Sequence, residues 1–520
     1  MKLTTLKLSN FRGYKDPIEI RFDNLTVFVG KNDIGKSTIL EAMDIFFNDG
    51  KGIIKLDKDD VNKQSLTMGN LETIISASFS ELPDEIIIDS TSSTTLQNEF
   101  MLNQNGELEI IKKYNNGGKA SIYIKAYHPT NPACEKLLQK KNTELRTIIN
   151  NESIECENLS VNSIMRRAIW DHYSDNLQFS EIEIEVAKED AKKIWDKISL
   201  HLPIYSLFQS DRKNSDGDNE VQDPMKEAVK QILSDTAIQN MLETIAIQVE
   251  TKLRDVATRT LTKLNEVSPD IAHGLNPVIP SAQTLKWTDV FKGVSISADE
   301  DIPINKRGSG VKRLILLSFF RAEAERRLLD SEGPGIIYAI EEPETSQHSH
   351  NQKLLINAFK TLSQAENTQV ILTTHSSHMV KQLAFDDLRL IIEVAAGAKQ
   401  ILDVEPSILK YPSLNEVNYS AFDEVSEEYH DELYSFLEYH RWLNDYKVGK
   451  PQLPYTKLRN DGSTVQEQHI LATYIRHQIH HAENTHNRPY TAQELKQSIE
   501  EMRIYIRSRA EREGLWTPIP

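Results

Sequence analysis

Cysteine is almost absent from this chain, with Cys134 and Cys156 as its two examples in 520 residues. So low a cysteine content excludes a disulfide framework and favours a reducing compartment. Long apolar runs are also lacking. The longest, around 314–320, falls far short of the roughly 20 residues that a membrane helix needs. We therefore expect a cytoplasmic protein with no membrane partner.

An excess of positive charge is lacking as well. The formal net charge is -17 at pH 7, which excludes a general attraction to nucleic acid and leaves such binding to local basic patches or to a partner. Hydrophobic residues make up 39% of the chain and charged residues 26%, as in ordinary globular proteins. A chain of 520 residues exceeds one ordinary core, so two or three domains are expected.

Strands alternate with helices in two separate parts of the chain. In the first part, the pattern predicts strands over 3–8, 18–22, 25–29 and 71–79, a helix over 36–47, and a hairpin from 108–114 to 120–127. In the second part, it predicts helices over 310–329 and 351–362 and strands over 335–340 and 368–372. This alternation indicates an α/β fold, in which helices cover a largely parallel sheet.

The residues directly after 25–29 form a complete phosphate-binding loop. Residues 30–37 read GKNDIGKS, the G-x-x-x-x-G-K-S motif between an apolar strand and a helix. Its glycines let backbone N–H groups point at phosphate oxygens, its lysine brings a charge to them, and its serine hydroxyl can bind Mg²⁺. The predicted ATP ligands are Gly30, Lys31, Asn32, Asp33, Ile34, Gly35, Lys36, Ser37 and Thr38, with Ser37 also binding the metal.

Two downstream strands end in residues suited to phosphate chemistry. The apolar strand 335–340 is followed by Glu341, which suits a Mg²⁺ ligand, and by Glu342, which suits a catalytic residue that activates water. His375 follows the next strand and lies where α/β folds bind ligands, so we predict that it senses the γ-phosphate. The alternative is a solvated pair of acids and a structural histidine.

A second helix start lies far from the loop. Ser309 is suited to cap the helix that begins at Gly310, which gives another anion-binding end. One nucleotide does not need two such ends, so these two residues are predicted to contact ATP held by another subunit of a homo-oligomer. An ordinary helix cap is the alternative.

Together these elements resemble the ABC-type ATPase heads of the SMC, RecF and OLD-nuclease group. The opening segment 6–13, LKLSNFRG, looks like the first strand and turn of that group, which implies that Arg12 approaches the phosphates. Ser309 and Gly310 match its degenerate signature segment, and His375 matches its switch histidine. In the acidic pair, Glu341 replaces the more usual aspartate.

The resemblance implies four segments. They are 1–130, the N-terminal half of an ATPase domain with the P-loop; 131–300, an inserted, mainly helical lobe; 301–405, the C-terminal half of the ATPase domain; and 406–520, a helical partner or effector domain.

A narrower resemblance is to the PtuA family, the ATPase subunits of Septu antiphage systems, some of which occur with retrons. It is carried by the segments 202–212, 221–225, 418–432 and 476–484. It implies that ATP-dependent dimerisation controls a small HNH nuclease of the PtuB type. It also implies DNA or RNA, and a retron reverse transcriptase with its msDNA, as candidate partners.

The C-terminal segment leaves two alternatives open. Arg476 and His481 have the R-x4-H spacing of HEPN ribonucleases, which would make the chain a nuclease by itself. The plainer interpretation is a polar helix that contacts the ATPase domain or a partner. Metal binding by His477 and His481 is less favoured because no glutamate follows His477. A RecF-like DNA-repair ATPase without nuclease is the further alternative.

Overall fold

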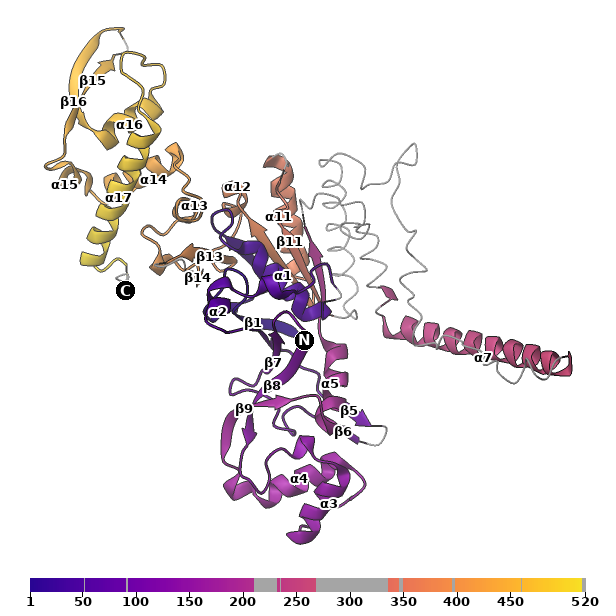
Figure 1. The fold of residues 1–520 in the computed structure, drawn as a ribbon. Coiled ribbons are helices and arrows are strands. Elements are labelled where there is room, and N and C mark those ends of the chain that lie inside the picture. Colours follow the sequence, from indigo (N-terminus) through magenta and orange to yellow (C-terminus); the bar gives the residue numbers. More distant parts are fainter. Residues whose placement is uncertain are drawn as a thin grey trace.

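The computed structural model describes residues 1–50, 52–89, 92–209, 232–233, 235–267, 335–345, 349–394, 398–459 and 461–516. These residues form two six-stranded sheets, an attached group of helices and a C-terminal domain (Figure 1). The predicted helix 310–329, with Ser309 and Gly310, lies outside the described residues. No helix within the described ranges is long and apolar enough to cross a membrane.

The first sheet is antiparallel throughout and has the order β2-β1-β4-β7-β8-β9. Its apolar face packs on the helix α1, Lys36–Asn48, where Phe46 stacks against Phe79. The strands are β1 (Lys2–Ser9), β2 (Ile18–Arg21), β4 (Glu72–Ser80), β7 (Leu108–Asn115), β8 (Ala120–Pro129) and β9 (Phe179–Glu185). A short separate hairpin joins β5 (Ile86–Asp89) to β6 (Ser92–Thr94).

The second sheet has the order β10-β11-β12-β3-β13-β14, and only its last pair is antiparallel. Every residue of β3 and β12 is buried, as expected for parallel strands covered on both faces. The strands are β10 (Ile204–Phe208), β11 (Ile336–Glu341), β12 (Thr368–Thr374), β3 (Leu25–Val29), β13 (Leu388–Glu393) and β14 (Lys399–Asp403).

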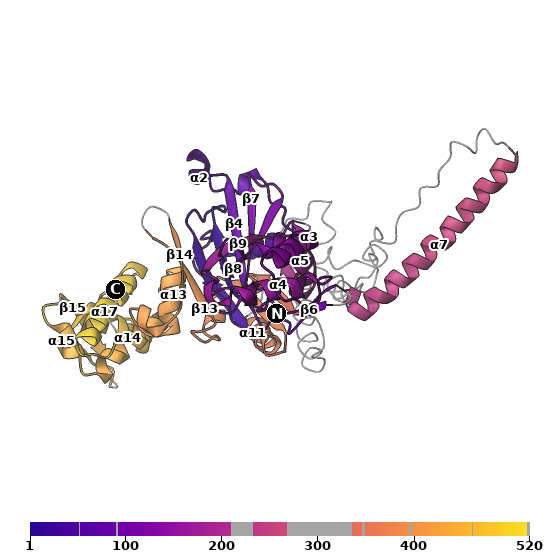
Figure 2. The same cartoon turned by 90° about the horizontal axis from the view of Figure 1, so that it is seen from below.

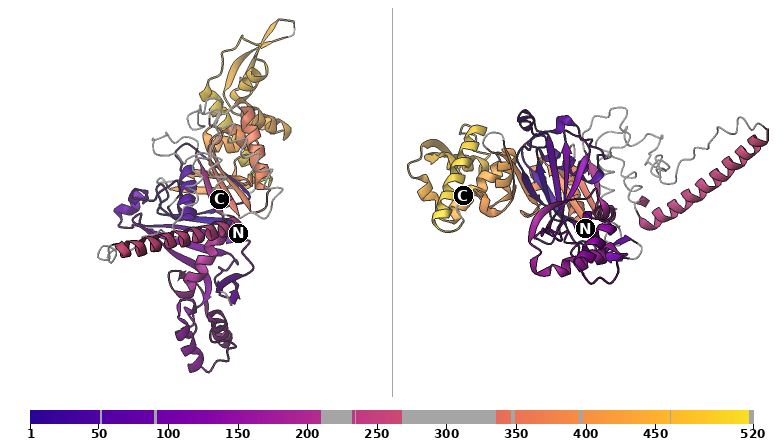
Figure 3. Two further views of the ribbon diagram at one scale, coloured as in Figure 1. Left: turned by 90° about the vertical axis from the view of Figure 1, so that its right-hand side faces the viewer. Right: turned by 60° about the horizontal axis from the view of Figure 1, so that its bottom comes forward.

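Alternate residues of these strands enter two different cores. In β11, Ile337 and Ala339 join the core that contains α1 and the first sheet, whereas Tyr338 joins the core formed with α11, Ser349–Ser363. The helix α1 is therefore buried between the two sheets, and α11 covers the outer face of the parallel sheet (Figures 1 and 3). The α/β fold predicted from the sequence is confirmed.

The predicted elements in the described residues agree with the structure to within two residues at each end. The consecutive strands β2 and β3, which flank Asp23 and Asn24, do not pair with each other. β2 belongs to the first sheet and β3 to the second. The reason lies in their patterns. β3 is buried on both faces and suits the centre of a parallel sheet, whereas β2 has exposed residues.

The middle segment differs from the inserted helical lobe predicted for 131–300. It contains α3 (Asn142–Asn151), α4 (Asn162–His172), α5 (Glu189–His201) and the long α7 (Thr236–Val267), which projects from the body in Figure 2. However, β9 completes the first sheet and β10 the second. Alternation of Ile182 and Ile184 with glutamates in β9, and the buried run of β10, explain why both are strands.

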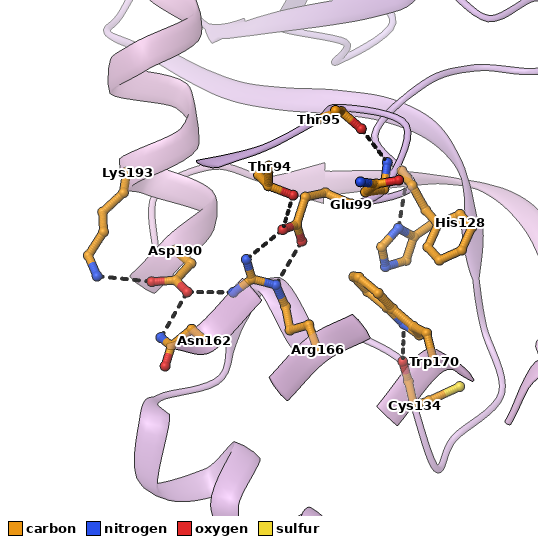
Figure 4. A network of polar contacts seen from close by, with 12 residues as sticks. Thr94, Thr95, Glu99, His128, Cys134, Asn162, Arg166, Trp170, Asp190 and Lys193 are labelled. Carbon is orange, nitrogen blue, oxygen red and sulfur yellow. Dashed lines mark hydrogen bonds and ion pairs between the residues drawn. The ribbon is translucent and has the colours of Figure 1, made fainter. Parts of the chain in front are cut away.

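A buried ion-pair network fixes α4 and α5 to the rest of the first half (Figure 4). The side chain of Arg166 is fully buried and donates from Nε and Nη2 to the two oxygens of Glu99, at 2.7 and 2.9 Å. Its Nη1 contacts Asp190, which also accepts from Lys193 at 3.0 Å. Buried charges of this kind are tolerated only when they are paired.

The C-terminal domain has its own core, rich in tyrosine and leucine. It contains α14 (Glu427–Tyr439), α15 (Leu443–Lys447), β15 (Gln452–Leu458), β16 (Thr464–Ile470), α16 (Leu471–His480) and α17 (Ala492–Arg512). The prediction of a helical domain over 406–520 is corrected by the β15–β16 hairpin. The side chains of β15 alternate in exposure along the strand. A turn that contains Gly462, with φ of 81°, joins β15 to β16, so the two strands that pair are neighbours in the sequence.

The helix α13, Leu414–Phe422, connects this domain to the parallel sheet. Its Val417 and Ala421 belong to the same core as α11, on the outer face of the sheet. Asn418 donates from Nδ2 to the carbonyl oxygen of Ser377, at 3.2 Å. Ser377 begins the short helix α12, Ser377–Val380, which follows β12.

Substituting Arg166→Met is expected to lower the free energy of unfolding by about 3 to 5 kcal/mol, because Glu99 and Asp190 would remain buried without their cation. Urea unfolding followed by tryptophan fluorescence measures this loss. The control Arg167→Met removes a neighbouring exposed arginine, whose distance to Asp171 is 3.8 Å, and should change stability by less than about 0.5 kcal/mol. Equal effects of the two substitutions would contradict the role of the buried network.

Candidate nucleotide-binding site

The loop between β3 and α1 turns sharply, as is expected of a phosphate-binding loop. Gly30, Asp33 and Gly35 have φ angles of 156°, 59° and 108°, so the chain curls tightly before α1 begins at Lys36. A Cβ at Gly35 would lie 3.0 Å from the Tyr14 hydroxyl, in a conformation that side chains rarely adopt. The motif therefore forms a tightly packed turn at the start of a helix.

The lysine of the loop is folded back over the loop itself. Lys36 is only 4% exposed, and its Nζ donates to the carbonyl oxygens of Gly30 and Lys31 at 2.8 and 3.0 Å. Burial lowers the pKa of Lys36, while the carboxylates of Glu342, Glu344, Asp33 and Glu341 act in the opposite direction. The ammonium group thus lies among acids that come from both halves of the chain.

The end of β11 lies directly against the loop. Ser37 Oγ donates to Oε1 of Glu341, although the two residues are 304 positions apart in the sequence. The strand register explains the contact, since β12 pairs with β11 on one side and with β3 on the other. The two residues predicted to bind Mg²⁺ are therefore in contact.

Glu342 occupies a turn that directs its side chain towards His375. Its φ is 42°, which is uncommon for a residue other than glycine, and its N–H donates to the carbonyl oxygen of Thr373 at 3.1 Å. The Oε2 of Glu342 lies 3.2 Å from Nδ1 of His375. The two residues predicted to be catalytic are thus neighbours at the carboxyl edge of the sheet.

Glu344 contacts both the backbone and the ring of His375. Its Oε1 accepts from the Thr374 hydroxyl at 2.6 Å and from the N–H of His375 at 2.8 Å, and it lies 3.5 Å from Nδ1 of the same histidine. Burial raises the pKa of Glu344, because the side chain is 3% exposed. The sequence places Glu344 in the acidic run 341–344 and leaves open how the roles divide among its three glutamates.

Two further residues at the loop were missed from the sequence. The Tyr14 hydroxyl donates to the carbonyl oxygen of Gly35 at 3.1 Å, and burial raises the pKa of this tyrosine. Lys399 Nζ lies 5.4 Å from the centre of the Tyr14 ring and 3.1 Å from the position that a Cβ of Gly35 would take. Burial lowers the pKa of Lys399. No local motif marks either residue.

Arg12 is held by two carboxylates beside α1. Its Nε donates to Asp60 at 2.7 Å, and its Nη1 contacts Glu41 of α1. Glu41 also accepts from the side chain of Gln209 at 3.3 Å. The approach of Arg12 to the phosphates stays a prediction, since its charge is paired in this arrangement.

The R-x4-H pair of the C-terminal domain is engaged in local contacts. Arg476 donates to Asp431 at 2.8 Å and lies 3.3 Å from Glu438, while its guanidinium stacks over Tyr434. His481 lies 3.2 Å from Glu483. Within the described residues, no group of three or more histidine, cysteine or acidic side chains could hold a metal ion. These contacts are those expected of a polar helix, while the ribonuclease alternative stays a prediction.

Residues 1–380 match the family model described as the AAA ATPase domain. The chain belongs to this family. A comparison with curated proteins found no match.

Similar solved structures include three SMC heads. An SMC head bound to the C-winged helix domain of ScpA is 13% identical, with a TM-score of 0.35, and the match covers 77% of this chain and 98% of that one. The SMC head domain from Thermotoga maritima is 14% identical, with a TM-score of 0.32, and the match covers 78% of this chain and 100% of that one. The third structure is the SMC head with an extended coiled coil, bound to the C-terminal domain of ScpA and derived from Pyrococcus furiosus. It is 12% identical, with a TM-score of 0.37, and the match covers 77% of this chain and 96% of that one. Likenesses this weak do not indicate a shared ligand, partner or assembly.

Substituting Lys399→Met is expected to weaken ATP binding about tenfold, because it removes a half-buried cation beside the loop, a loss of roughly 1.4 kcal/mol. Titration with a fluorescent ATP analogue measures the dissociation constant. The control Lys63→Met removes an exposed lysine of the helix α2, Lys63–Thr67, and should leave the constant unchanged. Unaltered binding by the Lys399→Met protein would contradict a contact between this lysine and the nucleotide.

Proposed function

We propose that this chain binds and hydrolyses Mg²⁺-bound ATP at the P-loop and that the bound nucleotide controls the association of its subunits. Membership of the AAA ATPase domain family supports the ATPase activity. The observation that carries the site assignment is the contact between Ser37 and Glu341, because it joins the phosphate loop to the acidic strand end.

Binding of the triphosphate is assigned to the loop and to Lys36. The ammonium group is buried, so its attraction to an anion is stronger than it would be in water. Phosphate oxygens would take the place of the carbonyl oxygens of Gly30 and Lys31 as its acceptors. The N–H groups at the start of α1 add further donors.

The metal ligands are assigned to Ser37 and Glu341. A hydroxyl and a carboxylate in contact supply oxygen ligands, which Mg²⁺ prefers, and the ion usually keeps several waters and binds phosphate oxygens as well. When bound, Mg²⁺ offsets the charge of the phosphates. The residues present therefore fit this cofactor.

Water activation is assigned to Glu342, with His375 as its neighbour. A carboxylate can accept a proton from the attacking water, and the turn at Glu342 holds it at the carboxyl edge of the parallel sheet, beside the P-loop. Glu344 accepts from the backbone of His375 and so keeps the imidazole in place to donate to the γ-phosphate. Arg12 and the remaining loop residues are assigned to the surroundings of the nucleotide.

Subunit association is inferred from the sequence around Ser309 and Gly310. A helix start that contacts a neighbour's nucleotide would make ATP part of the interface between two copies of this chain. The resemblance to the PtuA family extends the proposal to a prokaryotic antiphage complex, in which the ATP-bound dimer controls a separate HNH nuclease.

The substitution Glu342→Gln is expected to lower ATP turnover at least about 100-fold while leaving ATP affinity within about threefold of the unmodified protein. The amide keeps the shape of the side chain but cannot accept a proton. Phosphate release measures turnover, and titration with a fluorescent ATP analogue measures affinity. Glu366→Gln, at an exposed position, serves as control. Turnover at the normal rate in the Glu342→Gln protein would remove its assigned role.

Adding ATP to the Glu342→Gln protein is expected to convert it to a stable dimer, because the nucleotide is no longer hydrolysed. Light scattering after size-exclusion chromatography measures the mass. A further Ser309→Arg substitution should leave the protein monomeric, whereas Ser160→Arg at an exposed position should not.

A mass that does not respond to ATP would contradict the proposed interface and leave the hydrolysis assignment intact. Co-purification of an HNH nuclease with the dimer, but not with the Ser309→Arg protein, tests the final step of the proposal.

A further inference from the structure

The C-terminal domain contains a cavity of about 520 Å³ that lies apart from the nucleotide site. It is lined by the β15–β16 hairpin and by the end of α16 with the loop that follows. Figure 1 labels these three elements. The lining residues that matter below are Tyr455, Lys457, Arg459, His477, His481 and Asn484.

The floor of the cavity is buried and hydrogen-bonded. Tyr455 is 1% exposed, and its hydroxyl accepts from Nδ2 of Asn484 at 3.1 Å. The same amide donates to the carbonyl oxygen of Thr456 at 2.8 Å, which ties the loop after α16 to the hairpin. A floor fixed in this way does not need to be ordered when a ligand enters.

Three imidazole rings form a row, and two of them, those of His477 and His481, line the cavity. The ring centres of His469 and His477 are 4.8 Å apart and those of His477 and His481 are 6.0 Å apart, with interplanar angles of 28° and 20°. Burial, together with these two neighbours, lowers the pKa of His477 to about 4. His481, at the outer end of the row, is 54% exposed. The row thus ends in a flat ring that is open to solvent.

The rim carries two exposed cations, Lys457 and Arg459. Lys457 is 52% exposed and lies 3.3 Å from Glu467, which it shares with His469. In the part of the chain that the structure describes, Arg459 has no ion-pair partner, and it is exposed. The acids of the rim have neighbours of their own. Asp461 accepts from Ser463 at 2.6 Å, and Glu483 lies beside His481.

We propose that this cavity binds a nucleotide unit of single-stranded nucleic acid. Unpaired bases stack on flat side chains and their phosphates pair with lysine or arginine, the two features that the cavity combines. A base within a duplex is already stacked and paired, so it cannot enter a pocket of this size. Because the chain as a whole has a charge of -17, such binding has to be local.

The proposal goes beyond the ATPase function and does not depend on it. Neither Lys36 nor the acidic strand end contributes to the cavity. A variant that loses nucleic-acid binding should therefore keep normal ATP turnover, and a variant that loses ATP turnover should keep nucleic-acid binding.

Fluorescence anisotropy of the full chain with labelled 12-nucleotide single strands of DNA and RNA, and with a labelled duplex, tests the proposal at low salt. The double substitution Lys457→Ala and Arg459→Ala, and separately the substitution His481→Ala, should each weaken single-strand binding at least about tenfold. Lys496→Ala, which removes an exposed lysine paired with Asp423 in the same domain, is the matched control and should bind normally. Thermal unfolding and ATP turnover show that each variant is folded.

Tighter binding of single strands than of duplex, lost in both cavity variants, is the expected result. Adding millimolar nucleoside monophosphate should displace the oligonucleotide, because the cavity is sized for one nucleotide unit. Unchanged affinity in the double variant, equal affinity for duplex, or no binding of any single strand would each overturn the proposal. If His481→Ala unfolds the domain, His481→Gln at this exposed position gives the same test.

Discussion

The order of the parallel sheet is the constraint on which the nucleotide-site geometry depends, because it brings Ser37 and Glu341, which lie 304 positions apart, into a hydrogen bond. β12 lies between β3 and β11, with Thr374 opposite Val29 and Glu341 opposite Thr373, so the ends of three strands meet at one edge. Burial on both faces fixes this register, because a shift by one residue would exchange the sets of side chains that enter the two cores.

The electrostatics of the site follow from the same arrangement. One buried lysine lies in the field of four carboxylates, and the pKa of Glu344 is raised because its side chain is removed from water. In the proposed function, a triphosphate would add more negative charge to this region. The half-buried Lys399 and a divalent cation held by Ser37 and Glu341 would offset that charge, which explains why an acidic strand end would require a metal.

The P-loop, the strands and most helices could be predicted because their signals are local. Gly30, Gly35 and Lys36 form a motif, and β11 and β12 are apolar runs of strand length. Tyr14 and Lys399 could not be predicted, since their approach to the loop depends on how β1 and β14 pair in two different sheets. The middle segment was assigned as one lobe because its helices dominate the pattern, whereas β9 and β10 take their places only through partners far away in the sequence.

The attachment of α13 has a consequence for motion. His375 is followed almost at once by α12, whose first carbonyl group accepts from Asn418 of α13, and Lys381 forms an ion pair with Glu428 of α14. The segment after β12 and the C-terminal domain are therefore in direct contact, so a shift of one would either move the other or break these contacts.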